Sequence, residues 1–256
     1  MNTERSTLEI TGDDREHFLQ GIVTNDVTML GDIQFAALLS PQGKILHDFF
    51  LVKRDDAILL DVLTTQKDVL LKRLNMYKLR AKVAIRDASE IKVGYGDGLP
   101  DPRHPQLPCR NYSTLDYHAQ RLTLGIPDTT DLAEDTLLDA GYDLLNAVSF
   151  TKGCFVGQEV TARMHYKNIA RRGFYVVESA APLPPPGTQV IAAATAVGTL
   201  RGSISNRGLA MLKFAEIAKA QELNMPLLVD NTPLKITLPK WMEPKLAMFQ
   251  EEQNKQ

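Results

Sequence analysis

The chain has few cysteines, no excess of positive charge and no long apolar run, and each absence argues against a class of protein. Only two cysteines, Cys109 and Cys154, occur in 256 residues, which argues against a disulfide framework and favours a reducing compartment. The net charge of -2 lacks the basic excess typical of nucleic-acid-binding proteins. The longest apolar stretches, such as 48–52 and 57–62, have the length of strands, so no membrane span or membrane partner is expected.

The amino-terminal sequence MNTERSTLEITG has neither the apolar core of a signal peptide nor an arginine-rich presequence. We therefore expect a cytoplasmic protein, or a protein of the mitochondrial matrix if the source is eukaryotic. With 44% hydrophobic residues, the chain is long enough to bury a core in one large domain or in two to three small ones.

The amino-terminal half alternates strand patterns with helix patterns. Strands are expected over 33–39, 45–53, 57–62, 82–86 and 91–95, and helices over 13–23 and from 64 or 65 to 79. The sequence Ser40-Pro41-Gln42-Gly43 predicts a turn between the first two of these strands. Interleaved strands and helices of this kind favour an α+β fold, ferredoxin-like in its arrangement.

The carboxy-terminal half is divided by prolines and glycines. A loop is expected over 96–110, strands over 117–124 and 172–178, and a partly helical segment over 132–146. The sequence APLPPPG at 181–187 predicts a stiff spacer, and the short strands beyond it, ending at 234–238, suit a small barrel or sandwich. The expected organisation is thus a region 1–180 of two interleaved α+β subdomains, a β-barrel at 181–242 and a polar tail at 243–256.

The segment Thr151–Arg163, TKGCFVGQEVTAR, places unusual residue types close together. Gly153 and Gly157 allow a close backbone approach or a positive φ. A helix can begin at Gln158, and its exposed amides beside Lys152 would suit an anion. The same surroundings favour the thiolate form of Cys154. The simpler interpretation is that Cys154 is an ordinary small buried residue.

Charged side chains continue along the same segment. Glu159, Arg163 and Lys167 recur every four residues, which can be an ordinary row of ion pairs on a solvated helix face. A basic concentration is formed by Arg163, His165, Lys167, Arg171 and Arg172. It would meet an anionic ligand or an acidic partner, or it is an ordinary solvated face. The histidines and cysteines show no spacing typical of metal ligands, so no metal site is expected.

The segment closely resembles the K-G-C-[YF]-x-G-Q-E signature of the YgfZ family. Other parts of the chain resemble this family as well: FLQGIVTND at 18–26, YKLRAKV at 77–83, GIP at 125–127 and LPKW at 238–241. The resemblance implies a fold like that of the glycine-cleavage T-protein, in which three small subdomains form a ring and the last is a β-barrel. It also implies binding of tetrahydrofolate or a derivative.

The function implied by the resemblance is that of an accessory protein for iron–sulfur cluster assembly or repair, including the clusters of tRNA-modifying enzymes. Its partners would be folate and an iron–sulfur assembly or client protein, and direct tRNA contact through Arg171 is a weaker alternative. Whether any reaction is catalysed stays open. The alternative function is that of an aminomethyltransferase of the T-protein type.

The resemblance also assigns roles to residues. Asp139 aligns with the carboxylate that holds the pterin, and its shorter reach changes that geometry; the alternative is a surface aspartate. Cys154 and Lys152 would be the catalytic pair. The family's folate-assisting acid pair is reduced here to His47 and Asp48, either of which could do acid–base work or simply face solvent on a strand.

The remaining predicted ligands of folate lie in two places. Asn25 and Asp26 follow a helix end and either line the central opening or form an Asx turn. The signature segment would contribute the others: Gly153, Gly157, Gln158, Glu159 and Arg163. A cysteine cannot hold an iron–sulfur cluster alone, because such clusters normally take four ligands. Cys154 would therefore share a cluster with a partner or take part in a redox or transfer step.

Overall fold

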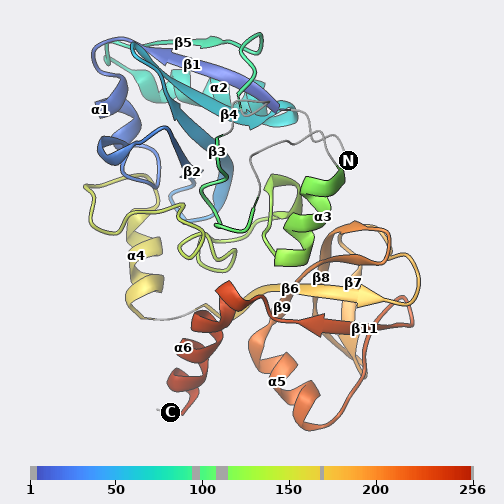
Figure 1. The fold of residues 1–256 in the computed structure, drawn as a ribbon. Helices are drawn as coiled ribbons and strands as arrows, with labels where there is room; N and C mark the ends of the chain where they lie inside the picture. The colour runs from blue at the N-terminus through green and yellow to red at the C-terminus, as the bar shows by residue number, and fades with distance from the viewer. Residues whose placement is uncertain (1–4, 94–98, 108–114, 168–169, 255–256) are drawn as a thin grey trace. The chain divides into compact units, whose positions relative to one another are not determined.

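The computed structural model describes residues 5–93, 99–107, 115–167 and 170–254 (Figure 1). The chain divides into two compact units. Unit 1 comprises Met1–Tyr117 and Leu145–Ala162, and unit 2 comprises His118–Leu144 and Arg163–Gln256. Each unit therefore draws on two separate parts of the sequence. Cys109 and the ends of the expected loop at 96–110 lie outside the described residues, as do the last two positions of the expected strand at 91–95.

Unit 1 is built on a five-stranded antiparallel sheet in the order β2-β3-β4-β1-β5. Its elements are β1 (Arg5–Thr11), α1 (Arg15–Gln20), η1 (Val27–Met29), β2 (Ile33–Leu39), β3 (Ile45–Lys53), β4 (Ala57–Leu63), α2 (Thr64–Lys78) and β5 (Ala84–Asp87). Strands β5-β1-β4-β3, with α1 and α2 as crossovers, have the ferredoxin-like order, and β2 adds an edge. This part of the expected fold is confirmed.

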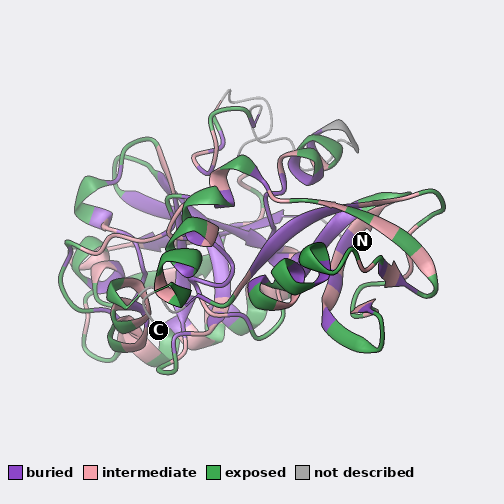
Figure 2. Ribbon diagram, turned by 90° about the horizontal axis from the view of Figure 1, so that it is seen from below, coloured by how far each residue is buried: buried purple, intermediate pink, exposed green. Residues whose placement is uncertain are grey.

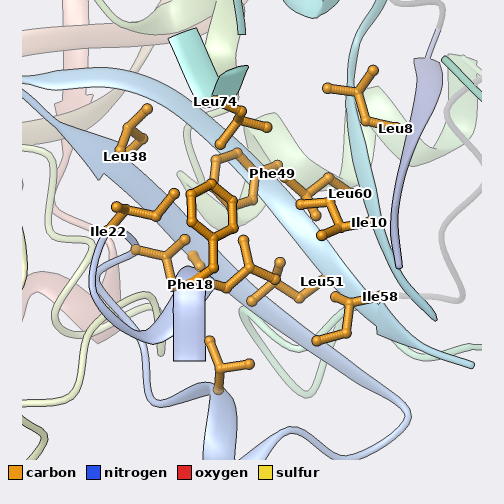
Figure 3. Packing of buried hydrophobic residues seen from close by; sticks show 14 of the residues in the cluster. Leu8, Ile10, Phe18, Ile22, Leu38, Phe49, Leu51, Ile58, Leu60 and Leu74 are labelled. Atoms are coloured by element: carbon orange, nitrogen blue, oxygen red, sulfur yellow. The ribbon is translucent and has the colours of Figure 1, made fainter. Parts of the chain in front are cut away.

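The core of unit 1 lies on one face of the sheet. Alternate residues of β3 and β4, among them Phe49, Leu51, Ile58 and Leu60, point to this face and pack with Leu74 of α2 (Figure 3). The period-2 pattern of the strands and the helical spacing of Leu70 and Leu74 bring these side chains together. The opposite face carries Phe35 and Phe50, whose rings lie 5.0 Å apart between centroids.

Unit 2 is built on a closed barrel in the order β10-β11-β6-β9-β8-β7. Its strands are β6 (Arg172–Ser179), β7 (Gln189–Ala192), β8 (Thr195–Ile204), β9 (Arg207–Lys213), β10 (Leu227–Val229) and β11 (Thr232–Thr237). The barrel therefore begins at Arg172, before the expected boundary at 181. The proline-rich segment is a loop between β6 and β7 rather than a spacer, since Leu183 packs against the barrel core.

Helices complete unit 2. They are α3 (Leu115–Leu124, which begins in unit 1), η2 (Thr129–Asp131), α5 (Phe214–Glu222), η3 (Lys240–Met242) and α6 (Glu243–Gln253). The segment 243–256, expected to be a polar tail, forms α6 through most of its length, because Phe249 and Leu246 pack against the barrel core. Figure 2 shows buried strands in purple and exposed outer helix faces in green.

Three expected elements differ from the structure. Residues 117–124 were expected as a strand but lie in α3, where Tyr117, Arg121 and Leu122 are buried at helical spacing. The segment 132–146 consists of turns, with Leu137, Leu138 and other apolar residues buried. The described residues 91–93 of the expected strand at 91–95 are not in a strand.

Candidate functional site

The signature segment presents Cys154 between two buried anchors. Lys152 and Phe155 are buried, while Gly153 and Cys154 are exposed. The Lys152 Nζ lies 5.2 Å from the centroid of the Phe155 ring, within the range of a cation–π contact. The Cys154 thiol is free and exposed, so it is not the ordinary buried cysteine of the simpler interpretation. We call residues 152–155 the cysteine tip.

The Lys152 ammonium is held by three backbone carbonyl oxygens. Its Nζ donates to Gln20 O at 2.7 Å, to Val23 O at 2.8 Å and to Asn25 O at 2.9 Å. An ammonium has three N–H donors, so all of them are used within unit 1. The expected anion site beside the helix at 158 therefore receives no donor from Lys152 in this geometry.

Burial changes the acid–base balance of this group. Desolvation lowers the pKa of Lys152 to about 8, and the negative charge of the nearby Asp26 opposes that shift. The ammonium lies among carbonyl dipoles and forms no ion pair with a carboxylate in the described part of the chain. Its positive charge is therefore balanced mainly by dipoles, with Asp26 acting only at a distance.

The two glycines that flank Cys154 do different things. Gly157 has φ +81°, and a Cβ there would lie 2.5 Å from Ser40 O, so the predicted need for glycine is real at this position. The cause is the 40–43 turn between β2 and β3, against which Gly157 packs. Gly153 has no positive φ, and a Cβ there would meet nothing within 4 Å. Its backbone needs no glycine on steric grounds.

Helix α4 (Gln158–Tyr166) follows the tip directly. Gln158 is half-buried at its start, and Glu159 and Arg163 are exposed. Thr161 faces inward and its hydroxyl donates to Gly157 O at 2.9 Å. The structure thus places Gln158 and Glu159 at the first turn beside the tip and Arg163 one turn further on.

Asn25 and Asp26 have local structural partners. Asn25 Nδ2 donates to Phe35 O at 2.9 Å and to Asn146 O at 2.7 Å. Asp26 begins the short helix η1 and accepts from the backbone N–H and the hydroxyl of Thr28, and the Thr28 hydroxyl is the main cause that lowers the pKa of Asp26. Of the two alternatives for Asp26, these contacts favour the Asx turn. The backbone carbonyl of Asn25 is one of the three that accept from Lys152 Nζ.

His47 and Asp48 lie on opposite faces of β3, because successive strand residues alternate. His47 is buried on the face of α2, where its Nδ1 lies 3.0 Å from Gln66 Oε1, and desolvation lowers its pKa. Asp48 is 2% exposed and its backbone is paired with Ala37 of β2. Neither is a solvent-facing strand residue, because both are buried.

Asp139 belongs to a charged network in unit 2. Arg172 Nε donates to Asp139 Oδ2 at 3.0 Å, and the Arg172 guanidinium also lies 3.5 Å from Asp135 Oδ1. Asp135 in turn accepts from Arg201 at 3.1 Å. The Asp139 side chain is 10% exposed, and its Oδ1 has no hydrogen-bond partner among the described residues. Asp139 is therefore an oriented carboxylate, not a freely solvated one.

The predicted site residues divide between the units. Asp139 and Arg163 belong to unit 2, and the others belong to unit 1. Within unit 1 the fold brings Lys152, Asn25 and Asp26 together although they are distant in sequence. It places Gly157 against the 40–43 turn. Cys154 projects from the same loop.

A buried polar cluster in unit 1 escaped sequence reasoning. Arg103 is 1% exposed and pairs with Asp101 Oδ2 at 2.8 Å, and the Tyr117 hydroxyl donates to the same carboxylate at 2.7 Å. The guanidinium also lies 5.4 and 5.2 Å from the ring centroids of Phe35 and Phe50. The feature of the sequence that could have indicated this cluster is the pair Asp101 and Arg103 inside a proline-rich loop. That indication is weak, because loops commonly carry solvated charges.

The described residues hold no group of three or more His, Cys, Asp or Glu that could bind a metal ion. Among the helices of the described ranges, none is long and apolar enough to cross a membrane.

Comparison with known proteins gives three likenesses. Residues 171–244 match the family described as CAF17, C-terminal beta-barrel domain, which covers the barrel and η3. The chain is 28% identical over 270 residues to iron-sulfur cluster assembly factor IBA57, mitochondrial, from Mus musculus, covering 82% of this chain and 75% of that protein. The Homo sapiens protein of the same name is 27% identical, covering 81% and 75%.

Among solved structures, glycine cleavage system aminomethyltransferase T from Bartonella henselae superposes with a TM-score of 0.68 at 13% identity. The match covers 94% of this chain and 85% of that protein. The chain is therefore related in sequence to proteins named as iron–sulfur cluster assembly factors. Its mixed α+β fold with a carboxy-terminal six-stranded barrel is T-protein-like, as the resemblance implied.

Proposed function

We propose that this protein is an accessory factor for the assembly or repair of iron–sulfur clusters. The observation that carries the proposal is the similarity to two named iron–sulfur cluster assembly factors over 81 to 82% of the chain. This similarity includes both units, whereas the barrel family alone covers only 171–244. In a eukaryotic cell the factor would work in mitochondria, as the names of these relatives suggest.

Cys154 is the group through which the factor would meet its cluster or client. Its thiol is exposed at the cysteine tip, where a partner can reach it. Because one thiolate supplies one ligand and a cluster normally takes four, the other ligands would come from a partner protein. The cluster is cargo in this function, and the clients would include tRNA-modifying enzymes, as the resemblance to the YgfZ family implies.

The function includes binding of tetrahydrofolate or a derivative. Asp139 fits the role of a pterin-holding carboxylate, because Arg172 fixes Oδ2 while Oδ1, which has no hydrogen-bond partner among the described residues, could accept from a ring N–H. When bound, the folate would supply its one-carbon or redox chemistry. The chain would contribute the acceptor and its orientation by Arg172.

Anaerobic calorimetric titration with tetrahydrofolate tests this part. Binding of tetrahydrofolate is expected for the unaltered chain and for Cys154→Ser. For Asp139→Asn we expect that the heat of binding is no longer observed. Arg201→Gln is a matched control within the same network, because it contacts Asp135 but not Asp139. No heat with the unaltered chain would reject folate binding while leaving the iron–sulfur role to its own test.

Aminomethyl transfer is not part of this function. The likeness to aminomethyltransferase T stands at 13% identity and concerns the fold alone. Of the two residues at the position of the acid pair, only Asp48 is an acid, and it is buried on β3.

The central test is complementation in human cells that lack the relative named above. The chain, fused to a mitochondrial leader, should restore the activity of iron–sulfur enzymes measured in cell extracts. A folded, correctly delivered protein that restores none of these activities would reject the proposed function. The proposed function would also be rejected if the chain restored only the activity of enzymes that contain no iron–sulfur cluster.

A further inference from the structure

The cysteine tip is tied to a distant part of unit 1 by a single side chain. The three carbonyls that bind Lys152 Nζ lie 127 to 132 positions away in the sequence. Gln20 is the last residue of α1, whose terminal carbonyls have no partner within the helix. Lys152 therefore serves as a long-range crosslink, and on the other side of the tip Phe155 is buried beneath it.

We propose that Lys152 is a positioning residue, which fixes the cysteine tip to the end of α1 and to Asn25 so that Cys154 is presented to a partner in one place. This inference rests on the proposed function in one respect, namely that Cys154 is the functional thiol. It differs from a catalytic pair of Lys152 and Cys154, in which the ammonium would act on the sulfur directly.

The geometry favours positioning over direct action. All three N–H donors of the ammonium are used by carbonyl oxygens at 2.7 to 2.9 Å, so none remains for the thiolate. Hydrogen bonds from a charged donor are about twice as strong as neutral ones. The lysine therefore holds a segment whose exposed residues, Gly153 and Cys154, otherwise have few contacts to order them.

Fixing the thiol has a consequence for association. A loop that is already ordered loses less conformational entropy when a partner binds it. Gly153 alone would allow many backbone conformations, so the order must come from its two neighbours. A rigid tip thus holds the Cys154 thiol in one place for the partner protein that binds it.

A nitroxide spin label on Cys154 tests the proposal directly. Cys109→Ser removes the other cysteine, so that the label reports the tip alone. The parent protein should give an electron paramagnetic resonance spectrum with an immobilised component. In Lys152→Met, which keeps the aliphatic stem, that component should be lost. Lys152→Arg, which keeps a charged donor, should restore part of it, and the exposed control Lys53→Met should leave the spectrum unchanged.

Two outcomes would overturn the proposal. One is a folded Lys152→Met protein whose label is as immobile as in the parent. The other is an equal gain of mobility in Lys53→Met, which would show a general loosening. If Lys152→Met does not fold, Phe155→Leu provides the second test, because it removes the ring contact while keeping the ammonium; it should give a smaller gain of mobility.

The spectrum does not depend on clusters or folate, so the inference can fail separately from the proposed function. If the tip loosens in Lys152→Met and the cells of the complementation test lose iron–sulfur enzyme activity, positioning matters for function. If the tip loosens and activity is unchanged, the positioning role in that function is rejected while the role of the factor stands.

Discussion

Two buried lysines, one in each unit, are held in different ways. Lys152 in unit 1 is 8% exposed and donates to three carbonyl oxygens. Lys245 in unit 2 is 5% exposed, donates to Leu138 O at 2.6 Å and pairs with Asp143 Oδ1 at 2.7 Å. Desolvation lowers the pKa of both groups, and for Lys245 the Asp143 carboxylate opposes the shift.

Lys245 forms a structural ion pair, whereas Lys152 links two distant segments of the chain. Lys245 ties α6 to the turns at 138–143, and its charge is neutralised where it lies. Lys152 contacts backbone carbonyls and the Phe155 ring and pairs with no carboxylate of the described residues, so removing it leaves no buried carboxylate without its cation. The second arrangement instead ties down a segment that carries an exposed thiol.

The largest effect is expected from Lys245→Met. This change leaves the Asp143 carboxylate, 11% exposed, without its cation, and breaking a buried pair from one side typically costs about 3–5 kcal/mol. Trp241 is the one tryptophan of the chain and lies in unit 2, so urea unfolding followed by its fluorescence measures the change. Lys245→Met combined with Asp143→Leu should recover much of the loss. A loss in the single variant below about 1 kcal/mol, the value typical of an exposed pair, would contradict the account.

A smaller effect is expected from Gly157→Ala in unit 1. The alanine must adopt φ +81° and its Cβ would press on Ser40 O, at a cost of about 1–3 kcal/mol. Because Gly43 N donates to the same carbonyl, hydrogen exchange at the Gly43 amide should become faster. Gly153→Ala is the matched control, since nothing surrounds that Cβ and no change is expected at Gly43. Equal exchange in the two variants would show that the 40–43 turn does not require glycine at 157.

A further effect concerns pH. The pKa of Lys152 is about 8 in the folded chain against an ordinary value of 10.5, so the unfolded chain binds more protons between these values. Stability of unit 1 therefore rises with pH from about 8 towards 10.5. Hydrogen exchange of residues 20–25, measured across this range, should slow relative to Lys152→Met, which lacks the titrating group. The same pH dependence in both proteins would contradict the assignment.

The sequence predicted those parts of the fold whose signal is local. The strands expected at 33–39, 45–53 and 57–62, the turn at 40–43 and the helix from 64 or 65 to 79 all correspond to the structure. Residues 117–124 were misassigned because tyrosine, threonine and leucine suit strands, while the tertiary burial of Arg121 selects the helix. The proline run was taken for a spacer because its composition does not reveal that Leu183 packs into the barrel core.

The candidate site depended more on long-range contacts. The unusual composition of 151–163 and the use of glycine at 157 were accessible from residue types and spacing, whereas the exposure of Cys154 was left open. The role of Lys152 was not, because its acceptors are backbone carbonyls more than a hundred positions away. Carbonyls carry no sequence signature. The partnership of Asp139 with Arg172 was hidden for the related reason that the two residues lie 33 positions apart in the sequence.

The most direct test of the central claim is iron–sulfur enzyme activity in the relative-deficient cells carrying Cys154→Ser or Cys109→Ser. Both variants remove one sulfur and differ only in which cysteine they remove. The account predicts that Cys109→Ser supports the activity of the unaltered chain and that Cys154→Ser abolishes it while the protein is still present and folded. Full activity with Cys154→Ser would contradict the account.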